Sequence, residues 1–478
     1  MANPHAVMVP CPTPGHINPM LHLAKLLHSR GFHITFVVTQ YNHQCLLSSG
    51  APDPLLGFPR VDSFRVETIP DGLPMSGRKG MQYIADLEAS LRSESIFHLR
   101  ELMARLGRSP GVPAVTCVVG ALMSAALQVA DELGVPKVLF WTTSACGFMG
   151  TLQCEELIRR GYVPLKDESC LTNGYLETEL DWIPGMIRGI RLRDITRFIR
   201  TTDPEDPMLE FERKEAEAGH GAWGVVLNTF EELEADVLAA LRRIFPRVYT
   251  LGPLSLLMNR SAHSPSRSIR LSLWKEDTEC LAWLDGRETS SVLYVNFGSI
   301  TVLTSQQLVE FALGLANSGH PFLWVIRPDL VAGESATLPE SVLEETAGRG
   351  FLTSWCPQEE VLAHPSVGGF LTHGGWNSML ESILNGVPML CWPFFAEQPT
   401  NCRYACKEWG VAMEIEGDVQ RGQVEGLVRE MMGGPKGNEM RRNTIKWKER
   451  AEEAAKCNGS SHRNMERFVL DLVGEASS

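Results

Sequence analysis

The sequence lacks several features that would each point to a particular class of protein. It has no run of about 18 consecutive apolar residues, so we expect no membrane-spanning helix. Its first residues show no basic segment followed by a long apolar one, so we expect no signal peptide. Its 12 cysteines include no CxxC pair, which favours reduced, mostly buried thiols in a cytoplasmic protein.

Positive charge is also scarce. The chain has 44 Lys and Arg against 57 Asp and Glu, a net charge of −13, which argues against nucleic acid or an anionic membrane as its main partner. An apolar fraction of 44% is ordinary for a globular protein, and 478 residues exceed what one core usually supports. We therefore expect two domains, and the polar segment 259–268 is the best candidate for a linker.

Strands and helices alternate from the start of the chain. His5–Pro10 is a buried strand, residues 11–19 read as a loop with Pro19 in the first turn of a helix, and Phe32–Thr39 is the next strand. This is a βαβ unit, and it predicts a parallel sheet that holds ligands at the carboxyl ends of its strands. His16 falls at such an end. It can be a structural histidine that caps a helix or bonds a carbonyl, or a general base.

The same alternation continues and then restarts in the second half. Strands are predicted around 116–119, 136–141, 224–230, 247–253, 291–299 and 320–327, with a hydroxyl-rich loop at Thr142–Ser144 and a helix at Ser305–Ser318. Residues 150–220 are less regular and suit a variable cleft wall. No GxGxxG opens the first unit, which disfavours a dehydrogenase or a nucleotide-sugar epimerase. The pattern predicts an α/β fold with two doubly wound halves and a cleft between them.

The stretch Trp355–Gln398 carries the strongest local signal. A short strand, the turn THGG, the helix WNSMLESIL and the second strand VPMLCWP follow one another, and Gly386 ends the helix. A strand, a glycine turn and a helix start favour a phosphate, because free backbone N–H groups and the helix dipole attract negative charge. His373, Asn377 and Ser378 add side-chain donors there.

This 44-residue stretch closely resembles the donor-binding box of plant secondary-product UDP-glycosyltransferases, which are inverting family 1 enzymes with the GT-B fold. The resemblance extends over nearly the whole chain, through PxPxxGHINPM, FWTTSACGFMG, NTFEELE, YTLGPL and VNFGS, and is closest to the subfamily that acts on small terpenoid, cyanohydrin or related aglycones. It implies two Rossmann-like domains that face each other across a cleft. The implied division is residues 1–252 for the acceptor domain, 253–275 for a linker, 276–455 for the UDP-sugar domain and 456–478 for a helix that packs back on the first domain.

The resemblance also implies a role for each position that matches the motif. Trp355 would stack on uracil and the backbone of Cys356 would read its edge, while Gln358 and Glu381 would contact the ribose. The diphosphate would be held by four side chains and one backbone group, namely those of Ser299, His373, Asn377 and Ser378 and the backbone at Trp376. Glu397 and Gln398 would bind the sugar hydroxyls, with Thr142 reaching the sugar from the other domain. Phe148, Phe394 and Phe395 would line the acceptor pocket.

An indole offers a flat apolar face for a base, and a carboxylate beside an amide suits vicinal hydroxyls.

Gln398 together with Trp376 implies UDP-glucose as the donor. His16 would take the proton of an acceptor hydroxyl, which attacks the anomeric carbon to give a β-O-glucoside. No Asp-x-Asp pair occurs, so we expect no metal and no cofactor, with UDP-glucose as a co-substrate. We expect a monomer that binds a UDP-sugar and a small lipophilic aglycone and does not bind nucleic acid.

Two positions depart from the family pattern. Gly374 stands where Cys is usual, for which we expect only a looser turn. Relatives read roughly CVVSDGxxS at the strand VTCVV, with an Asp just after it that supports the catalytic His, whereas this chain reads CVVGALMS and has no Asp there. The next acid, Asp131, lies well along the following helix. Another polar group can orient His16, the acceptor can be acidic enough to need little help, or the protein can be impaired and bind UDP-sugar without transfer.

Overall fold

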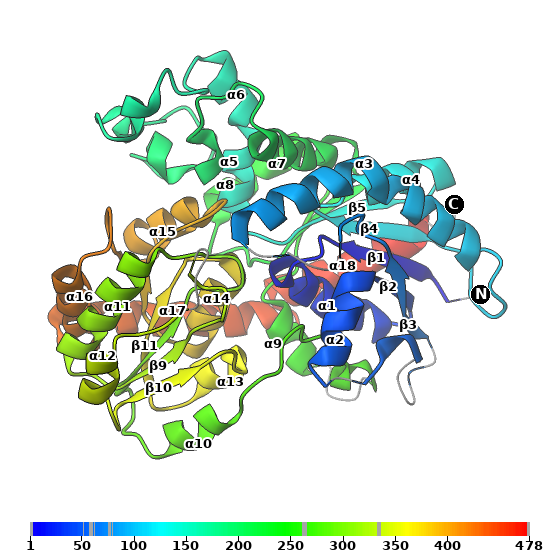
Figure 1. The fold of residues 1–478 in the computed structure, drawn as a ribbon. Helices are drawn as coiled ribbons and strands as arrows, with labels where there is room; N and C mark the ends of the chain where they lie inside the picture. The colour runs from blue at the N-terminus through cyan, green and yellow to red at the C-terminus, as the bar shows by residue number, and fades with distance from the viewer. Residues whose placement is uncertain are drawn as a thin grey trace.

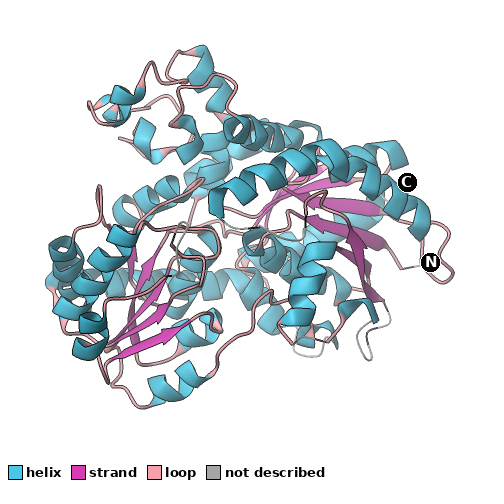
Figure 2. Ribbon diagram, in the orientation of Figure 1, coloured by secondary structure: helices cyan, strands magenta, loops and turns pink. Residues whose placement is uncertain are grey.

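The computed structural model contains two α/β units side by side, each built on its own parallel sheet (Figure 1). The structure describes residues 3–475 except 51, 57–60, 62, 75–77, 79, 261–264 and 332–335. The predicted linker segment 259–268 therefore lies partly outside the described residues. Helices cover both faces of each sheet (Figure 2). None of the helices formed by described residues is long and apolar enough to cross a membrane.

Among the described residues, the strands form one seven-stranded and one six-stranded sheet, and every paired strand runs parallel. The first sheet has the order β3 (Phe64–Ile69), β2 (His33–Thr39), β1 (His5–Pro10), β4 (Cys117–Ala121), β5 (Lys137–Trp141), β6 (Gly224–Leu227), β7 (Val248–Thr250). The second has the order β10 (Gly350–Thr353), β9 (Phe322–Val325), β8 (Val292–Asn296), β11 (Val367–Thr372), β12 (Met389–Cys391), β13 (Ala412–Glu414). The strand order reverses between β1 and β4 and again between β8 and β11, and such switch points are where open α/β sheets bind ligands.

The helices connect these strands and cover the two sheets. Around the first sheet they are α1 (Pro14–His28), α2 (Gln40–Ser48), α3 (Gly80–Leu106), α4 (Ser124–Leu133), α5 (Ala145–Leu152), α6 (Cys154–Arg159), α7 (Pro207–Glu217), α8 (Ala235–Ile244) and α9 (Leu254–Arg260). Those that follow are α10 (Glu279–Asp285), α11 (Ser305–Ser318), α12 (Glu340–Glu345), α13 (Gln358–Ala363), α14 (Trp376–Asn385), α15 (Gln398–Lys407), α16 (Arg421–Gly433), α17 (Pro435–Ala455) and α18 (Ser460–Glu475).

The buried strands agree with the sequence pattern because continuous Val, Ile and Leu runs are what a sheet covered on both faces requires. The helix at Ser305–Ser318 is confirmed, and its Thr304 cap accepts from the Gln307 backbone N–H. Gly134 and Gly386 end α4 and α14 in the left-handed conformation, as glycine allows. The edge strand β3 and the long helix α3 were not predicted.

The prediction for the first helix was wrong at its start. We expected residues 11–19 to form a loop, but α1 begins at Pro14, after the extended residue Thr13. Proline suits the first position of a helix, and Pro14 takes it, so Pro19 lies inside the helix. His16 therefore sits in the first helical turn.

The last two helices, α17 and α18, connect the two α/β units. The chain breaks between α17 and α18 at Asn458, which has a left-handed φ of 65°. α18 then lies against β7 of the first sheet, where the Tyr249 hydroxyl donates to Asp471 Oδ2 at 2.7 Å and the Tyr249 and Phe468 rings are 5.1 Å apart. Residues 145–217, with helices α5 to α7, form the irregular part above both sheets in Figure 1.

Candidate active site

The two sheets direct their switch points toward a shared site. His16 follows β1, Ser299 follows β8 and His373 follows β11. The Asn377 amide donates a 2.7 Å hydrogen bond to the backbone carbonyl of Gly15, directly beside His16. The donor box and the candidate base, 362 residues apart, are thus in contact.

A proline makes this contact possible. In a regular helix the N–H of Pro19 would bond the carbonyl four residues earlier, which belongs to Gly15. Proline has no N–H, so the regular helical hydrogen bond to that carbonyl is missing. Asn377 supplies the missing donor from the other sheet.

The His16 ring is held by a hydroxyl. Its Nδ1 lies 2.5 Å from Thr142 Oγ1, at the end of β5. Burial lowers the pKa of His16 to about 4, and the positive end of α1 acts in the same direction. His16 is therefore a neutral imidazole near pH 7, the form that can accept a proton.

The carboxylate that relatives place beside this histidine has no counterpart after β4. The strand ends at Ala121, and the chain turns into α4 through Leu122, which takes the left-handed φ of 48°. Asp131 lies on α4 and pairs with Lys137 at 2.5 Å. Within the described residues, the hydrogen bond to the His16 ring comes from Thr142 and not from a carboxylate.

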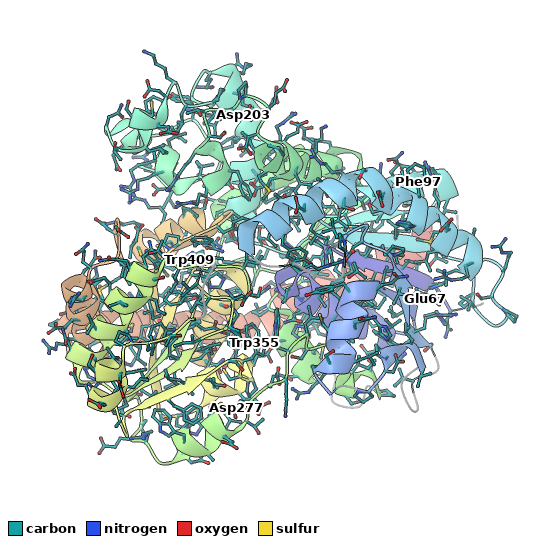
Figure 3. The ribbon with its side chains drawn as sticks, in the orientation of Figure 1. Glu67, Phe97, Asp203, Asp277, Trp355 and Trp409 are labelled. Atoms are coloured by element: carbon teal, nitrogen blue, oxygen red, sulfur yellow. The ribbon has the colours of Figure 1, made fainter. Side chains whose placement is uncertain are left out.

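The nucleobase end of the donor box contains an aromatic pair. Trp355, labelled in Figure 3, has its ring centroid 4.6 Å from that of Trp274. Trp274 comes from the segment before α10 and was not predicted. A Trp just after a polar linker could have been recognised as a candidate for this site. The two rings are tilted by 35°, so Trp274 packs against Trp355 without stacking flat on it. Cys356 beside it is 4% exposed.

The two residues predicted for the ribose lie together. Gln358 Nε2 donates to Glu381 Oε2 at 2.7 Å and to Ser378 Oγ at 3.0 Å. Asn296 Nδ2 donates to Gln358 Oε1 at 2.8 Å, which fixes the orientation of the amide. Burial raises the pKa of Glu381 to about 8. The pair is a preorganised set of polar groups for hydroxyls, and Asn296 was not predicted.

The phosphate-binding turn is built around glycine. Gly374 has a φ of 82°, and its carbonyl accepts from Asn401 Nδ2 at 3.1 Å. We expected a looser turn, but glycine adopts this left-handed conformation without the steric cost that a Cys would carry. Gly375 then caps α14, whose first N–H groups are free for an anion.

His373 and Ser299 lie at this turn with a buried arginine. Burial is the main cause that lowers the pKa of His373 to about 4, and the charge of nearby Arg327 acts in the same direction. The ring is therefore a neutral donor and not a cation. Arg327 donates to the Ser299 carbonyl at 2.8 Å and to the Thr301 carbonyl at 2.6 Å. Arg327 is 4% exposed and was not predicted, although it follows β9 at the edge where ligands bind.

The sugar end of the box is buried. Gln398 Oε1 accepts from the backbone N–H groups of Phe394 and Phe395, at 2.9 and 2.8 Å, which leaves its NH2 group to donate. Glu397 packs against Gly147 of α5, where a Cβ would lie 2.7 Å from Glu397 Cγ. Burial raises the pKa of Glu397 to about 7. Glu397 offers carboxyl oxygens and Gln398 its NH2 group, and their contact with sugar hydroxyls stays a prediction.

Trp376 joins the two halves. Its indole N–H donates to the Asn228 carbonyl at 2.9 Å, and the Trp409 indole donates to the Leu233 carbonyl at 3.0 Å. Both acceptors lie in the NTFEELE segment, and Figure 3 labels Trp409. The Trp376 side chain therefore anchors the donor box to the first half.

The residues predicted to line the acceptor pocket are not all together. Phe395 meets Phe198 edge to face at 5.0 Å, and Phe198 was not predicted. Phe394 lies 6.2 Å from Trp392. Phe148 is fully buried and stacks on Trp141 at 4.5 Å. This placement does not support a pocket-lining role for Phe148, because the core encloses its ring.

Two doubly wound parallel sheets that meet at their switch points define the GT-B class of glycosyltransferase. The chain matches the family described as "UDP-glucoronosyl and UDP-glucosyl transferase" over residues 225–452. It is 54% identical to the 7-deoxyloganetin glucosyltransferase of Gardenia jasminoides, with 98% of each chain covered. It is 51% identical to the (R)-mandelonitrile beta-glucosyltransferase of Prunus dulcis, with 98% of this chain and 97% of that one covered. Its fold is similar to that of Os79 from O. sativa in complex with UDP, with a TM-score of 0.82, 29% identity, and 98% and 100% of the two chains covered. The chain belongs to the family of UDP-glucuronosyl and UDP-glucosyl transferases.

Proposed function

We propose that the protein transfers glucose from UDP-glucose to a hydroxyl of a small lipophilic plant metabolite, with inversion, to give a β-O-glucoside. The observation that carries the proposal is the contact of Asn377 with Gly15, which brings the phosphate turn next to His16. The relatives named for 7-deoxyloganetin and (R)-mandelonitrile support terpenoid or cyanohydrin-type acceptors. They do not favour a protein that binds the sugar nucleotide without transferring it.

In this mechanism, Nε2 of neutral His16 accepts the acceptor's hydroxyl proton while the oxygen forms its bond to the anomeric carbon. The bond from that carbon to the diphosphate breaks, and both its electrons leave with UDP. The N–H groups at the start of α14 and the side chains of Ser299, His373 and Asn377 stabilise the charge on UDP. The opposite directions of attack and departure convert the α-linked donor into a β-linked product.

The remaining donor contacts are assigned in the same proposal. Trp355 and the Cys356 backbone bind uracil, Gln358 and Glu381 the ribose, Ser378 and the Trp376 backbone the diphosphate, and Thr142, Glu397 and Gln398 the glucose. Phe394 and Phe395, with Phe198, line the acceptor side. The reaction is assigned no metal, since backbone amides and neutral donors supply the stabilisation of the leaving group. A cytoplasmic enzyme of secondary metabolism fits the cysteine usage and the relatives' substrates, and we propose that it acts as a monomer.

The test is incubation with UDP-glucose and a panel of monoterpenoid alcohols, cyanohydrins and phenols, with products identified by mass spectrometry and by the NMR coupling of the anomeric proton. A β-glucoside is expected, and His16→Ala is expected to lower kcat about 10²- to 10⁴-fold. His462→Ala on α18 is the control and should leave kcat unchanged. UDP binding with no glucoside from any acceptor, or an α-glucoside, would overturn the proposal.

A further inference from the structure

The strand order places Thr142 where it can act on His16. β4 lies between β1 and β5 in the sheet, so the His16 ring, which follows β1, reaches past the end of β4 to contact a residue that follows β5. Ala121 ends β4 and pairs with Pro10 of β1. The strand end that lies between those of β1 and β5 therefore carries only a methyl group.

Three observations place these groups on one face of the sheet. Ala121 and Phe140 belong to the same buried cluster as Ile17, the residue after His16. Side chains alternate along a strand, so Thr142 points to the same face as Phe140. The 2.5 Å contact between His16 Nδ1 and Thr142 Oγ1 agrees with this placement.

The shortened segment after β4 explains why this contact forms. The chain is one residue shorter here than CVVSDGxxS, and it passes from Ala121 to α4 through the left-handed residue Leu122. No carboxylate is left at the end of β4, and the ring bonds to the next strand instead. Thr142 is 1% exposed, so water does not compete strongly for the contact.

We infer that Thr142 is the positioning residue for His16 and takes over the orienting task of the absent carboxylate. This inference rests on the proposed function. The working tautomer carries its hydrogen on Nδ1 and donates it to Thr142 Oγ1, which leaves the Nε2 lone pair for the acceptor proton. After transfer, Nε2 holds that proton, and the imidazolium keeps its Nδ1–H bond to the hydroxyl until it releases the proton to solvent.

A hydroxyl performs this task differently from a carboxylate. It is neutral, so it stabilises the imidazolium through a dipole and not a full charge. It can also donate to Nδ1, which would place the ring hydrogen on Nε2 and block proton acceptance. Thr142 thus orients the ring strongly but selects its tautomer weakly, and the enzyme should favour acceptors whose hydroxyl is already fairly acidic.

The test compares Thr142→Val, which keeps the shape, with Thr142→Ser, which keeps the hydroxyl. Each is assayed with an aliphatic alcohol and with a nitrophenol at a pH where the phenol is ionised and needs no base. With the alcohol, Thr142→Val should lower kcat about 10- to 100-fold, the range of a hydrogen bond to a charged group. With the ionised phenol its effect should stay below about threefold, and Thr142→Ser should restore most of the alcohol activity.

A double-mutant cycle with His16→Ala separates this role from a contact with glucose. If Thr142 acts through His16, Thr142→Val should have no further effect on the alcohol reaction once His16 is alanine. An equal loss with both acceptors, or effects that add in the double mutant, would overturn the inference and leave Thr142 as a sugar contact alone. An unchanged rate in Thr142→Val with a normal melting temperature would overturn it as well. Failure of the proposed function is distinct, because then the wild-type protein itself makes no glucoside.

Discussion

Inserting Asp between Gly120 and Ala121 should raise turnover with weakly acidic alcohols. The insertion keeps the pairing of β4 with β1 up to Gly120 and puts a carboxylate where Ala121 now pairs with Pro10, at the end of the strand that lies between those preceding His16 and Thr142. In the transition state His16 becomes an imidazolium. The Thr142 hydroxyl stabilises that imidazolium through a dipole, whereas a carboxylate within about 4–6 Å adds a full opposite charge, which shifts a pKa by about 1–3 units. One unit is about 1.36 kcal/mol, so the lower end of this range corresponds to about a tenfold gain in kcat.

The pH profile gives the second readout. The wild-type His16 pKa of about 4 keeps the base neutral down to about pH 5. A neighbouring carboxylate raises that pKa, so the variant's base becomes protonated at a pH where the wild-type base is still free. The gain should therefore be largest near pH 8 and should shrink or reverse near pH 5, with kcat/KM measured on one aliphatic alcohol.

The matched control is insertion of Asn at the same place, which adds the same length and shape without charge. Both insertions should lengthen the segment that now turns through Leu122, and both proteins should be compared by melting temperature and UDP affinity. If the Asp and Asn proteins turn over the alcohol equally, or if neither differs from wild type, then the lost carboxylate does not limit proton transfer and our reasoning is wrong.

Three further predictions concern buried groups. Pro19→Ala restores an N–H for the Gly15 carbonyl, so the melting temperature should rise while kcat falls several-fold, because Asn377 loses its contact beside His16. Glu212→Gln should raise the melting temperature at pH 8 but not at pH 5. Burial raises the pKa of Glu212 to about 8 in the fold, so the wild-type protein loses stability as the pH rises from about 4.5 to 8, by about 1.36 kcal/mol for each pH unit that separates the unfolded and folded pKa values. Arg327→Met should weaken UDP binding about tenfold by calorimetry, since it removes the bond that holds the Ser299 carbonyl.

Each of these has its own control. Asn377→Ala should lower kcat less in Pro19→Ala than in the wild type, because only its contact with the diphosphate is then left to lose; equal losses in both backgrounds would mean that the two residues act separately. Glu217→Gln lies on the same helix as Glu212 but is exposed, and a pH-dependent gain there would contradict the role of burial. Arg349→Met also removes bonds to backbone carbonyls, those of Ala316 and His320, and equal losses of UDP affinity would make the Arg327 effect one of stability.

Most of the fold could be predicted because its strands are short, continuous apolar runs with glycine-rich ends. β3 was missed because it is an edge strand whose Arg65 and Glu67 interrupt the apolar pattern and pair with each other. The start of α1 was missed because two prolines suit a first turn and the later one was chosen. The Thr13 residue before Pro14 is the signal that could have decided it.

Residues that belong to one local motif could be predicted from the sequence to lie near one another. Residues that are brought together only by the order of strands in the sheet could not. Gln358 and Glu381, both predicted to contact the ribose, lie on neighbouring helices and are hydrogen-bonded to each other. The contact of Thr142 with His16 depends on β4 lying between β1 and β5 in the sheet, and the spacing of residues along the sequence does not predict that order. Phe148 has the composition of a pocket wall, but only the packed fold shows Trp141 against its ring.

The Pro19 position shows how the two halves of the site are joined. An amide NH2 group has two hydrogens, so Asn377 can donate one to the Gly15 carbonyl and the other to a diphosphate oxygen. One side chain would then fix both the leaving group and the first turn of α1, which carries His16. Because the base, its hydroxyl support at Thr142 and the donor turn all sit at strand ends of parallel sheets, a small shift of α1 would move the base relative to the anomeric carbon. A proline that withholds one N–H would thus couple the occupancy of the donor site to the position of the base.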